Sequence, residues 1–172
     1  TISWSSPITD TGSYVVYGTN ISYGSVSSNQ SERVILADAS NDTLVVHHVT
    51  LTGLTPGTKY HYRCGGNSGL SGDCIFRTAP AGIEPFTFAV LGDIQASGFS
   101  SSTNKCASFL KEQDVDFIIQ VADIVQQGCH LSQWKALFES GKEMFESAPL
   151  MGCLGANHDV GYEASCGIVP EF

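Results

Sequence analysis

The sequence predicts a β-sandwich over residues 1–79 and an α/β unit over residues 86–172, joined by a linker at residues 80–85. In the first half, short β-branched and aromatic runs are separated by Gly, Asn, Ser and Pro, which is typical of a sandwich. The linker is rich in Pro and Gly. In the second half, apolar strand-like runs alternate with helical patterns, which indicates a parallel sheet covered by helices.

Six short runs of the first half are expected to be strands: residues 1–6, 13–19, 32–38, 43–54, 59–65 and 73–79. The most informative segment is the turn at Pro56 and Gly57, which is followed by Tyr60. It resembles the tyrosine corner of fibronectin type III domains, in which the phenol closes the turn. The chain begins at what resembles the second strand of such a sandwich. We therefore expect an open edge that pairs with another strand, with self-association as one outcome.

The second half reads as β-α-β-α-β. Its expected elements are strands at 86–93, 116–123 and 148–157, and helices at 102–113 and 132–146. Ser132 is the expected N-cap of the second helix, and Gly141 should weaken it. Right-handed crossovers would bring the carboxyl ends of the three strands to one edge of the sheet.

The composition limits the possible partners. Apolar residues make up 42% of the chain and charged residues 15%, which is typical of a folded globular protein. The formal net charge is −9, and only eight Lys and Arg are present, so nucleic acid is not an expected partner. No apolar stretch approaches the roughly 20 residues of a membrane-spanning helix, so no membrane partner is expected. An anionic substrate would need a local positive centre, such as a bound metal.

The six cysteines are an even number. Cys64 and Cys74 flank a Gly-rich turn between two strand-like runs, which favours a disulfide across a hairpin. Buried thiols are the alternative. The pairing of the other four stays open, with Cys129 and Cys166 as the favoured pair because both fall in loops at the strand ends.

Three Asn-x-Ser/Thr sequons occur, at Asn20, Asn29 and Asn41. All three fall in polar segments between expected strands. Together with the cysteine pattern they favour an oxidising setting, so we expect a secreted or extracellular glycoprotein.

Polar side chains follow each of the three strands of the second half. Asp93 follows the first strand, Asp123 the second, and Asn157, His158 and Asp159 the third. Ligands of open α/β sheets bind beyond the carboxyl ends of the strands. A single Asp there is a common turn residue, but donors after three consecutive strands predict a binding site.

The segments GDIQ (92–95), VADIVQQG (121–128) and GANHD (155–159) resemble, in order, three motifs of calcineurin-like metallophosphoesterases. The preceding sandwich makes the chain similar to the purple acid phosphatase branch of that family. The resemblance spans the chain but covers only the first part of the family's catalytic domain. It implies a truncated metallophosphoesterase-like domain from an enzyme that hydrolyses phosphate monoesters between two metal ions.

The resemblance also implies a role for each residue. Asp93 would bind the first metal, Asp123 would bridge both metals, and Asn157 would bind the second. His158 would hydrogen-bond the substrate or protonate the leaving group, and Asp159 would orient His158. Such donors suit Fe, Mn or Zn.

Several positions depart from the family's pattern. Gln95 and Gln126 stand where purple enzymes have a His and a Tyr that bind metal. Ala122 and Ala156 replace glycines, and Ala is strained if the backbone there needs positive φ. No His follows His158, although the family's remaining ligands come from two later His motifs.

Two hypotheses follow, and a third is less favoured. The chain is either part of a secreted metallophosphoesterase or part of an inactive relative that acts as an extracellular glycoprotein or assembly subunit. The third takes the polar strand ends as ordinary turns in an unrelated α/β domain. Because the metal site is incomplete, we expect these 172 residues alone to be inactive.

Overall fold

The computed structural model describes all residues except 29–30, 39–40, 96–107, 111, 154–156 and 161–172. The chain divides into two compact units. Unit 1 comprises Thr1–Leu36 and Thr43–Glu84, and unit 2 comprises Ala37–Asp42 and Pro85–Phe172.

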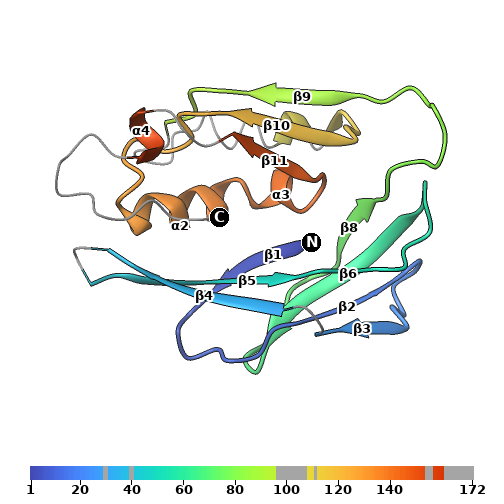
Figure 1. Cartoon of the computed structure of the whole chain (residues 1–172), viewed down its shortest axis with the longest axis horizontal. Coiled ribbons are helices and arrows are strands. Elements are labelled where there is room, and N and C mark those ends of the chain that lie inside the picture. Colours follow the sequence, from blue (N-terminus) through green and yellow to red (C-terminus); the bar gives the residue numbers. More distant parts are fainter. Residues whose placement is uncertain (29–30, 39–40, 96–107, 111, 154–156, 161–172) are drawn as a thin grey trace. The chain divides into compact units, whose positions relative to one another are not determined.

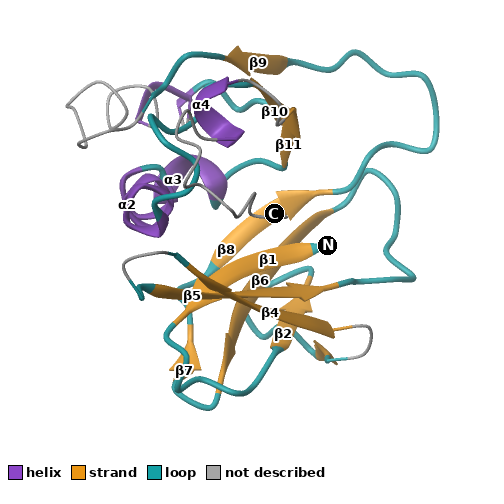
Figure 2. Ribbon diagram, turned by 60° about the vertical axis from the view of Figure 1, so that its left-hand side comes forward, coloured by secondary structure: helices purple, strands orange, loops and turns teal. Residues whose placement is uncertain are grey.

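Unit 1 is a sandwich of two sheets. Its strands are β1 (Ile2–Ser6), β2 (Tyr14–Gly18), β3 (Ser25–Ser27), β4 (Ser31–Ala37), β5 (Thr43–Val49), β6 (Lys59–Gly66), β7 (Gly69–Leu70) and β8 (Cys74–Arg77). One sheet has the order β1-β5-β4, and the other has the order β3-β2-β6-β7, with β8 pairing to β6. Buried Val15 and Tyr62 of one sheet pack with Val49 of the other, so the core lies between the sheets. Figure 2 shows these strands in orange. Each of the six expected strands is present, although the one expected at 43–54 ends at Val49; β3 and β7 are additional.

The expected tyrosine corner is present. The hydroxyl of Tyr60 accepts a hydrogen bond of 3.0 Å from the backbone N–H of Thr55. The ring of Tyr60 stacks on Phe76 of the neighbouring strand, with centroids 5.4 Å apart. The phenol therefore closes the turn that precedes β6, as the Pro-Gly-x-x-Tyr pattern predicts.

The expected disulfide between Cys64 and Cys74 is not formed in the structure. The hairpin is longer than expected, because β7 intervenes between the two strands. Cys64 consequently faces Ser71, whose N–H donates to the Cys64 carbonyl at 2.8 Å. Cys74 instead pairs with Tyr62, two residues before Cys64 on the same strand. The two cysteines are diagonal neighbours, and diagonal pairs lie farther apart than a disulfide favours.

Unit 2 contains a three-stranded parallel sheet of order β11-β10-β9. Its elements are β9 (Phe88–Leu91), β10 (Phe117–Val121), α2 (Leu131–Ser140), α3 (Lys142–Phe145), β11 (Leu150–Cys153) and α4 (Asn157–Val160). Residues 108–110 and 112 are also helical, within the helix expected at 102–113. In Figure 1 the strands lie side by side with α2 and α3 on one side. Among the described helices, none has both the length and the apolar character to cross a membrane.

The helix expected at 132–146 is divided in two at Gly141, which ends α2 and precedes α3. Its N-cap is His130 and not the expected Ser132, and the His130 side chain makes no capping hydrogen bond. The carboxylate of Asp38, in the Ala37–Asp42 segment of unit 2, accepts the N–H of Leu131 at 3.0 Å instead. An acceptor distant in sequence thus satisfies a donor of the first turn.

The two faces of the parallel sheet differ. On one face, Ile118 packs with Leu110, Met144 and Ala148 in a buried cluster. The other face carries large apolar side chains that remain exposed: Phe88 46%, Val90 55%, Val121 47% and Met151 56%. Parallel sheets are normally covered on both faces. The described residues therefore provide only one of the two layers that such a sheet needs.

Candidate functional site

The expected site residues meet at the carboxyl edge of the parallel sheet. Asp93 follows β9 and Asp123 follows β10, while His158 and Asp159 lie in α4, after β11. The N–H of Asp93 donates to the carbonyl of Ala122 at 3.4 Å. The N–H of His158 donates to Oδ1 of Asp123, also at 3.4 Å. All three strand ends are thus linked, the last through the side chain of Asp123, as the predicted topology requires. Asn157 is in α4, but its side chain lies outside the described residues.

The backbone at this edge adopts left-handed conformations. The φ values are 51° at Asp93, 41° at Gln95, 67° at Ala122 and 52° at Asp123. Asp tolerates this region because its short polar side chain can bond locally, whereas Ala is strained there. The strain expected at Ala122 is confirmed. Ala156, the other Gly-to-Ala position, lies outside the described residues.

Replacing Ala122 by Gly should stabilise unit 2. Relief of the left-handed strain gains about 1–2 kcal/mol, and the greater freedom of unfolded Gly offsets about half of it. We expect urea unfolding to show a net gain of about 0.5–1 kcal/mol. Ala136→Gly, in the middle of α2, is the matched control and should lose about 1 kcal/mol. A loss in both variants would show that the φ at Ala122 is not strained.

The structure shows what the carboxylate of Asp159 binds after β10. Asp159 is buried, with 2% of the residue exposed. Oδ2 accepts the N–H of Asp123 at 2.9 Å, and Oδ1 accepts the N–H of Ile124 at 2.8 Å. Asp159 therefore holds the turn after β10, and with it the backbone of Asp123.

The imidazole of His158 contacts Gln126. Nδ1 of His158 lies 2.8 Å from the backbone oxygen of Gln126 and 3.0 Å from its side-chain Nε2. A carbonyl oxygen only accepts, so Nδ1 donates to it when Nδ1 carries a hydrogen. When Nδ1 carries none, it can accept from the Nε2–H of Gln126 instead. Gln126 stands where the family has Tyr, and here it contacts the imidazole of His158. Sequence reasoning identified the departure but not this contact.

Gly128 permits the close approach of α4 to the loop after β10. Its N–H donates to the carbonyl of His158 at 2.8 Å. A Cβ at Gly128 would lie 1.6 Å from the backbone oxygen of Asp159, which no side chain could tolerate. The same loop contains Cys129, which is disulfide-bonded. Its expected partner, Cys166, lies outside the described residues.

The donors present are only part of a two-metal centre. The described residues contain no group of three or more His, Cys, Asp or Glu placed to hold a metal ion. Asp93 is exposed and Asp123 is half-buried, so both can offer hard oxygen donors at one edge. A metal pair needs several protein ligands for each ion to offset repulsion and lost hydration. The described residues do not fit a complete dinuclear centre.

The geometry defines a β-sandwich followed by a parallel α/β unit with acidic residues at its carboxyl edge. Residues 1–78 match the family model for the "Purple acid Phosphatase, N-terminal domain". The chain therefore resembles the N-terminal region of purple acid phosphatases, and the likeness of its first 78 residues is to that family's N-terminal domain.

Relatives and solved structures agree with this assignment. Purple acid phosphatase 21 of Arabidopsis thaliana is 30% identical over 67% of this chain and 24% of its own length. Probable purple acid phosphatase 20 of the same plant is 30% identical over 82% of this chain and 33% of its own length. The chain thus spans about a quarter to a third of these relatives.

A purple acid phosphatase from yellow lupin (Lupinus luteus) seeds superposes with a TM-score of 0.69 at 18% identity. The match covers 96% of this chain and 36% of that one. PhoD superposes with a TM-score of 0.61 at 16% identity, over 91% of this chain and 34% of its own. At these identities the likeness concerns the fold alone.

Proposed function

We propose that the chain is the N-terminal part of a secreted metal-dependent phosphatase that hydrolyses phosphate monoesters. The observation that carries the proposal is the meeting of Asp93, Asp123 and His158 at one sheet edge, beyond a sandwich of the purple acid phosphatase type. The α/β unit would be part of a metallophosphoesterase domain. Its exposed apolar sheet face supports this, because a complete domain would cover that face.

Two metal ions of the Fe, Mn or Zn type would supply a phosphate clamp and an activated hydroxide when bound. Asp93, Asp123 and Asn157 would provide ligands for them. Asp159 would hold the backbone that carries Asp123, and Gln126 would hold the ring of His158. Catalysis itself requires ligands beyond those present here.

An inactive relative is the second candidate, acting as an extracellular glycoprotein or assembly subunit. The observation that favours it is the contact between Gln126 and His158, since the family has a metal-binding Tyr at that position. Gln95 likewise stands where the family has a metal-binding His.

We expect the 172-residue chain alone to hydrolyse phosphate esters poorly. Without a fixed metal pair there is neither an activated hydroxide nor a phosphate clamp. The assay uses an aryl phosphate with added Mn, Fe or Zn, and Asp123→Asn is the paired variant. Turnover within tenfold of about 10 s⁻¹, lost on Asp123→Asn, would overturn the view that the site is incomplete. A longer chain with the missing ligands should be active and should lose activity on the same substitution. Retained inactivity there would favour the second candidate.

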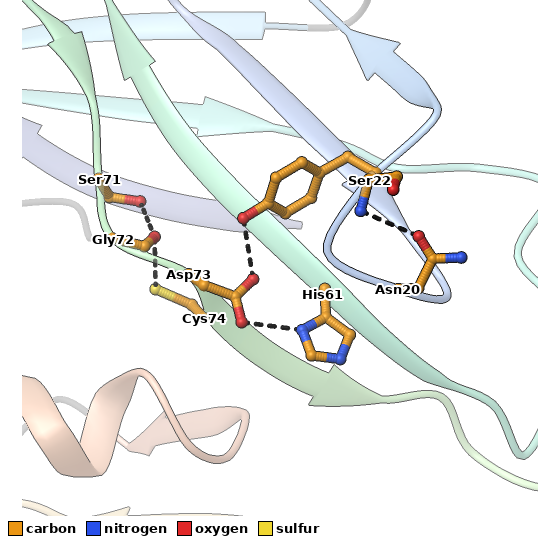
Figure 3. A network of polar contacts seen from close by, with 8 residues as sticks. Asn20, Ser22, His61, Ser71, Gly72, Asp73 and Cys74 are labelled. Atoms are coloured by element: carbon orange, nitrogen blue, oxygen red, sulfur yellow. Dashed lines mark hydrogen bonds and ion pairs between the residues drawn. The ribbon is translucent and has the colours of Figure 1, made fainter.

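Secretion should be accompanied by N-glycans on the sequons. Asn20 suits modification, because its Oδ1 accepts the N–H of Ser22 at 2.9 Å while the side chain is exposed (Figure 3). Asn41 is also exposed, whereas Asn29 lies outside the described residues. Peptide mass spectrometry of protein from a eukaryotic secretory host should find glycan at Asn20 and Asn41. Unmodified Asn at both positions would contradict the secretory proposal.

The proposed function also implies which partners the chain has. A phosphate ester is the proposed substrate, and nucleic acid and membrane are not proposed partners. Strand β1 lies at the edge of its sheet and pairs only with β5 among the described strands, so we propose that this edge mediates self-association. Sedimentation should detect a dimer, and a strictly monomeric chain at high concentration would count against it.

A further inference from the structure

The charge of the chain is distributed unevenly between the units. Unit 1 has four acidic and four basic residues, whereas unit 2 has thirteen acidic and four basic ones. The whole formal charge of −9 therefore belongs to unit 2. Three of the four basic residues of unit 1 lie on the paired strands β6 and β8.

Lys59 and Arg77 lie directly opposite each other on β6 and β8. Alternation along β6 places His61 and Arg63 on the same face as Lys59, because Tyr60 and Tyr62 point into the core. Opposed residues of paired strands share a face, so Arg77 belongs to it too. These four residues form what we name the basic stripe: Lys59, His61, Arg63 and Arg77.

The cations at the end of this stripe lack compensation. Both Lys59 and Arg77 are exposed, and neither forms an ion pair with any described residue. Like charges directly opposite each other destabilise a sheet. An anion held between the two side chains would remove that repulsion.

The nearby carboxylate of Asp73 is already used on both oxygens. Oδ2 lies 2.8 Å from Nδ1 of His61, and Oδ1 accepts the hydroxyl of Tyr23 at 3.1 Å. Figure 3 shows the contact between Asp73 and His61. The guanidinium of Arg63 is similarly fixed, because it donates to the carbonyls of Ser71 and Leu70. The stripe is therefore ordered, and its free cationic capacity lies at Lys59 and Arg77.

We propose that the basic stripe binds oxyanion groups, phosphate or sulfate, of an extended anionic glycan, with Lys59 and Arg77 as the main contacts. The planar guanidinium binds two oxyanion oxygens and the ammonium supplies a compact charge. Lys59 and Arg77 lie opposite each other and would bind one group. Arg63, four residues from Lys59 and so about 13–14 Å along the strand, donates to carbonyls and keeps its charge, which would attract a further group of the same polymer. The choice of a glycan over a nucleic acid rests on the proposed secretory setting.

Binding of a heparin-type sulfated glycan to the 172-residue chain tests the proposal. We expect the double variant Lys59→Gln/Arg77→Gln to bind at least tenfold more weakly and to lower the slope of log K against log salt by about two. Thermal unfolding should show an equal or higher Tm for this variant, because the repulsion is gone. Lys142→Gln, which removes a cation of α3 that pairs with Glu146, is the control and should leave glycan binding unchanged.

Four results would overturn the proposal. The double variant could bind the glycan as tightly as the unaltered chain. Lys142→Gln could lose as much binding, which would indicate diffuse attraction. Single-stranded DNA could bind through the same two residues as tightly as the glycan, which would show that the polymer class is wrong. Inorganic phosphate should compete only weakly, and full competition by it would show a site for the free ion. None of these readouts depends on phosphatase activity.

Discussion

Asp159→Asn is expected to destabilise unit 2 by about 3 kcal/mol, the usual magnitude when hydrogen bonds to a buried charged group are lost. The carboxylate accepts three backbone N–H groups: that of Asp123 on Oδ2, and those of Ile124 and, at 3.5 Å, Val125 on Oδ1. An amide of the same size keeps one acceptor oxygen but turns a donor toward the N–H on the other side. At least one backbone donor is then left without a partner.

The effect should be local before it is global. Hydrogen exchange should accelerate most at the amides of Asp123 and Ile124, because these are the groups that Asp159 holds. Urea unfolding measures the total loss. Asp114→Asn is the matched control, since Asp114 is exposed, has a φ of 48° that Asn also accepts, and should change stability by less than about 0.5 kcal/mol. Unchanged exchange at Asp123 in Asp159→Asn would show that the turn is held by other contacts.

His47→Phe is expected to cost unit 1 about 2–3 kcal/mol near neutral pH, because two hydrogen bonds of a buried group are lost. His47 is fully buried. Nε2 lies 2.7 Å from the hydroxyl of Ser6, and Nδ1 lies 2.6 Å from that of Ser13. The imidazole also stacks on Trp4, with centroids 4.9 Å apart. Phe keeps the stacking surface but leaves both hydroxyls without their imidazole partner.

The same residue should make the sandwich sensitive to acid. Burial lowers the pKa of His47 below its ordinary value of 6.5, and the neighbouring charge of Arg33 adds to the effect, with His48 acting in the same direction and Asp10 opposing it. The unfolded chain then binds the proton more readily than the folded one. Stability is therefore fully present above about pH 6.5 and declines as the pH falls from there toward the lower folded pKa.

Urea unfolding at about pH 7.5 and about pH 5 separates this contribution from other titrating groups. The loss on acidification should be smaller in His47→Phe than in the unaltered chain. His48→Gln is the control, because His48 is the next residue, points to the other face of β5 and contacts Ser3. An identical pH dependence in His47→Phe would assign the acid sensitivity to another group.

The sequence predicted the parts of the fold that depend on neighbouring residues. Short β-branched and aromatic runs, with turn residues between them, predicted the six main strands of the sandwich, and the Pro-Gly-x-x-Tyr pattern predicted the hydrogen bond of Tyr60. The parallel order of the second half followed from its alternation of strands and helices. The same topology placed Asp93 and Asp123 at one edge, where their backbones prove to be linked through Ala122.

Other features depended on pairing between distant segments. Cys64 and Cys74 are diagonal because β7 lengthens the hairpin, which spacing alone did not reveal. His47 is fully buried, which the pattern of the expected strand at 43–54 did not indicate. The N-terminus of α2 is satisfied by Asp38 and not by Ser132.

By itself, the sequence determined which residues reach the carboxyl edge of the sheet, because strand periodicity and chain order fix where each strand ends. Only the tertiary structure decided what those residues do there. Asp159 binds the turn of Asp123, and Gln126 contacts His158, across more than thirty residues of intervening chain. Hydrogen bonds depend on distance and direction to within fractions of an ångström, and those are set by the packing of α4 against the loop after β10.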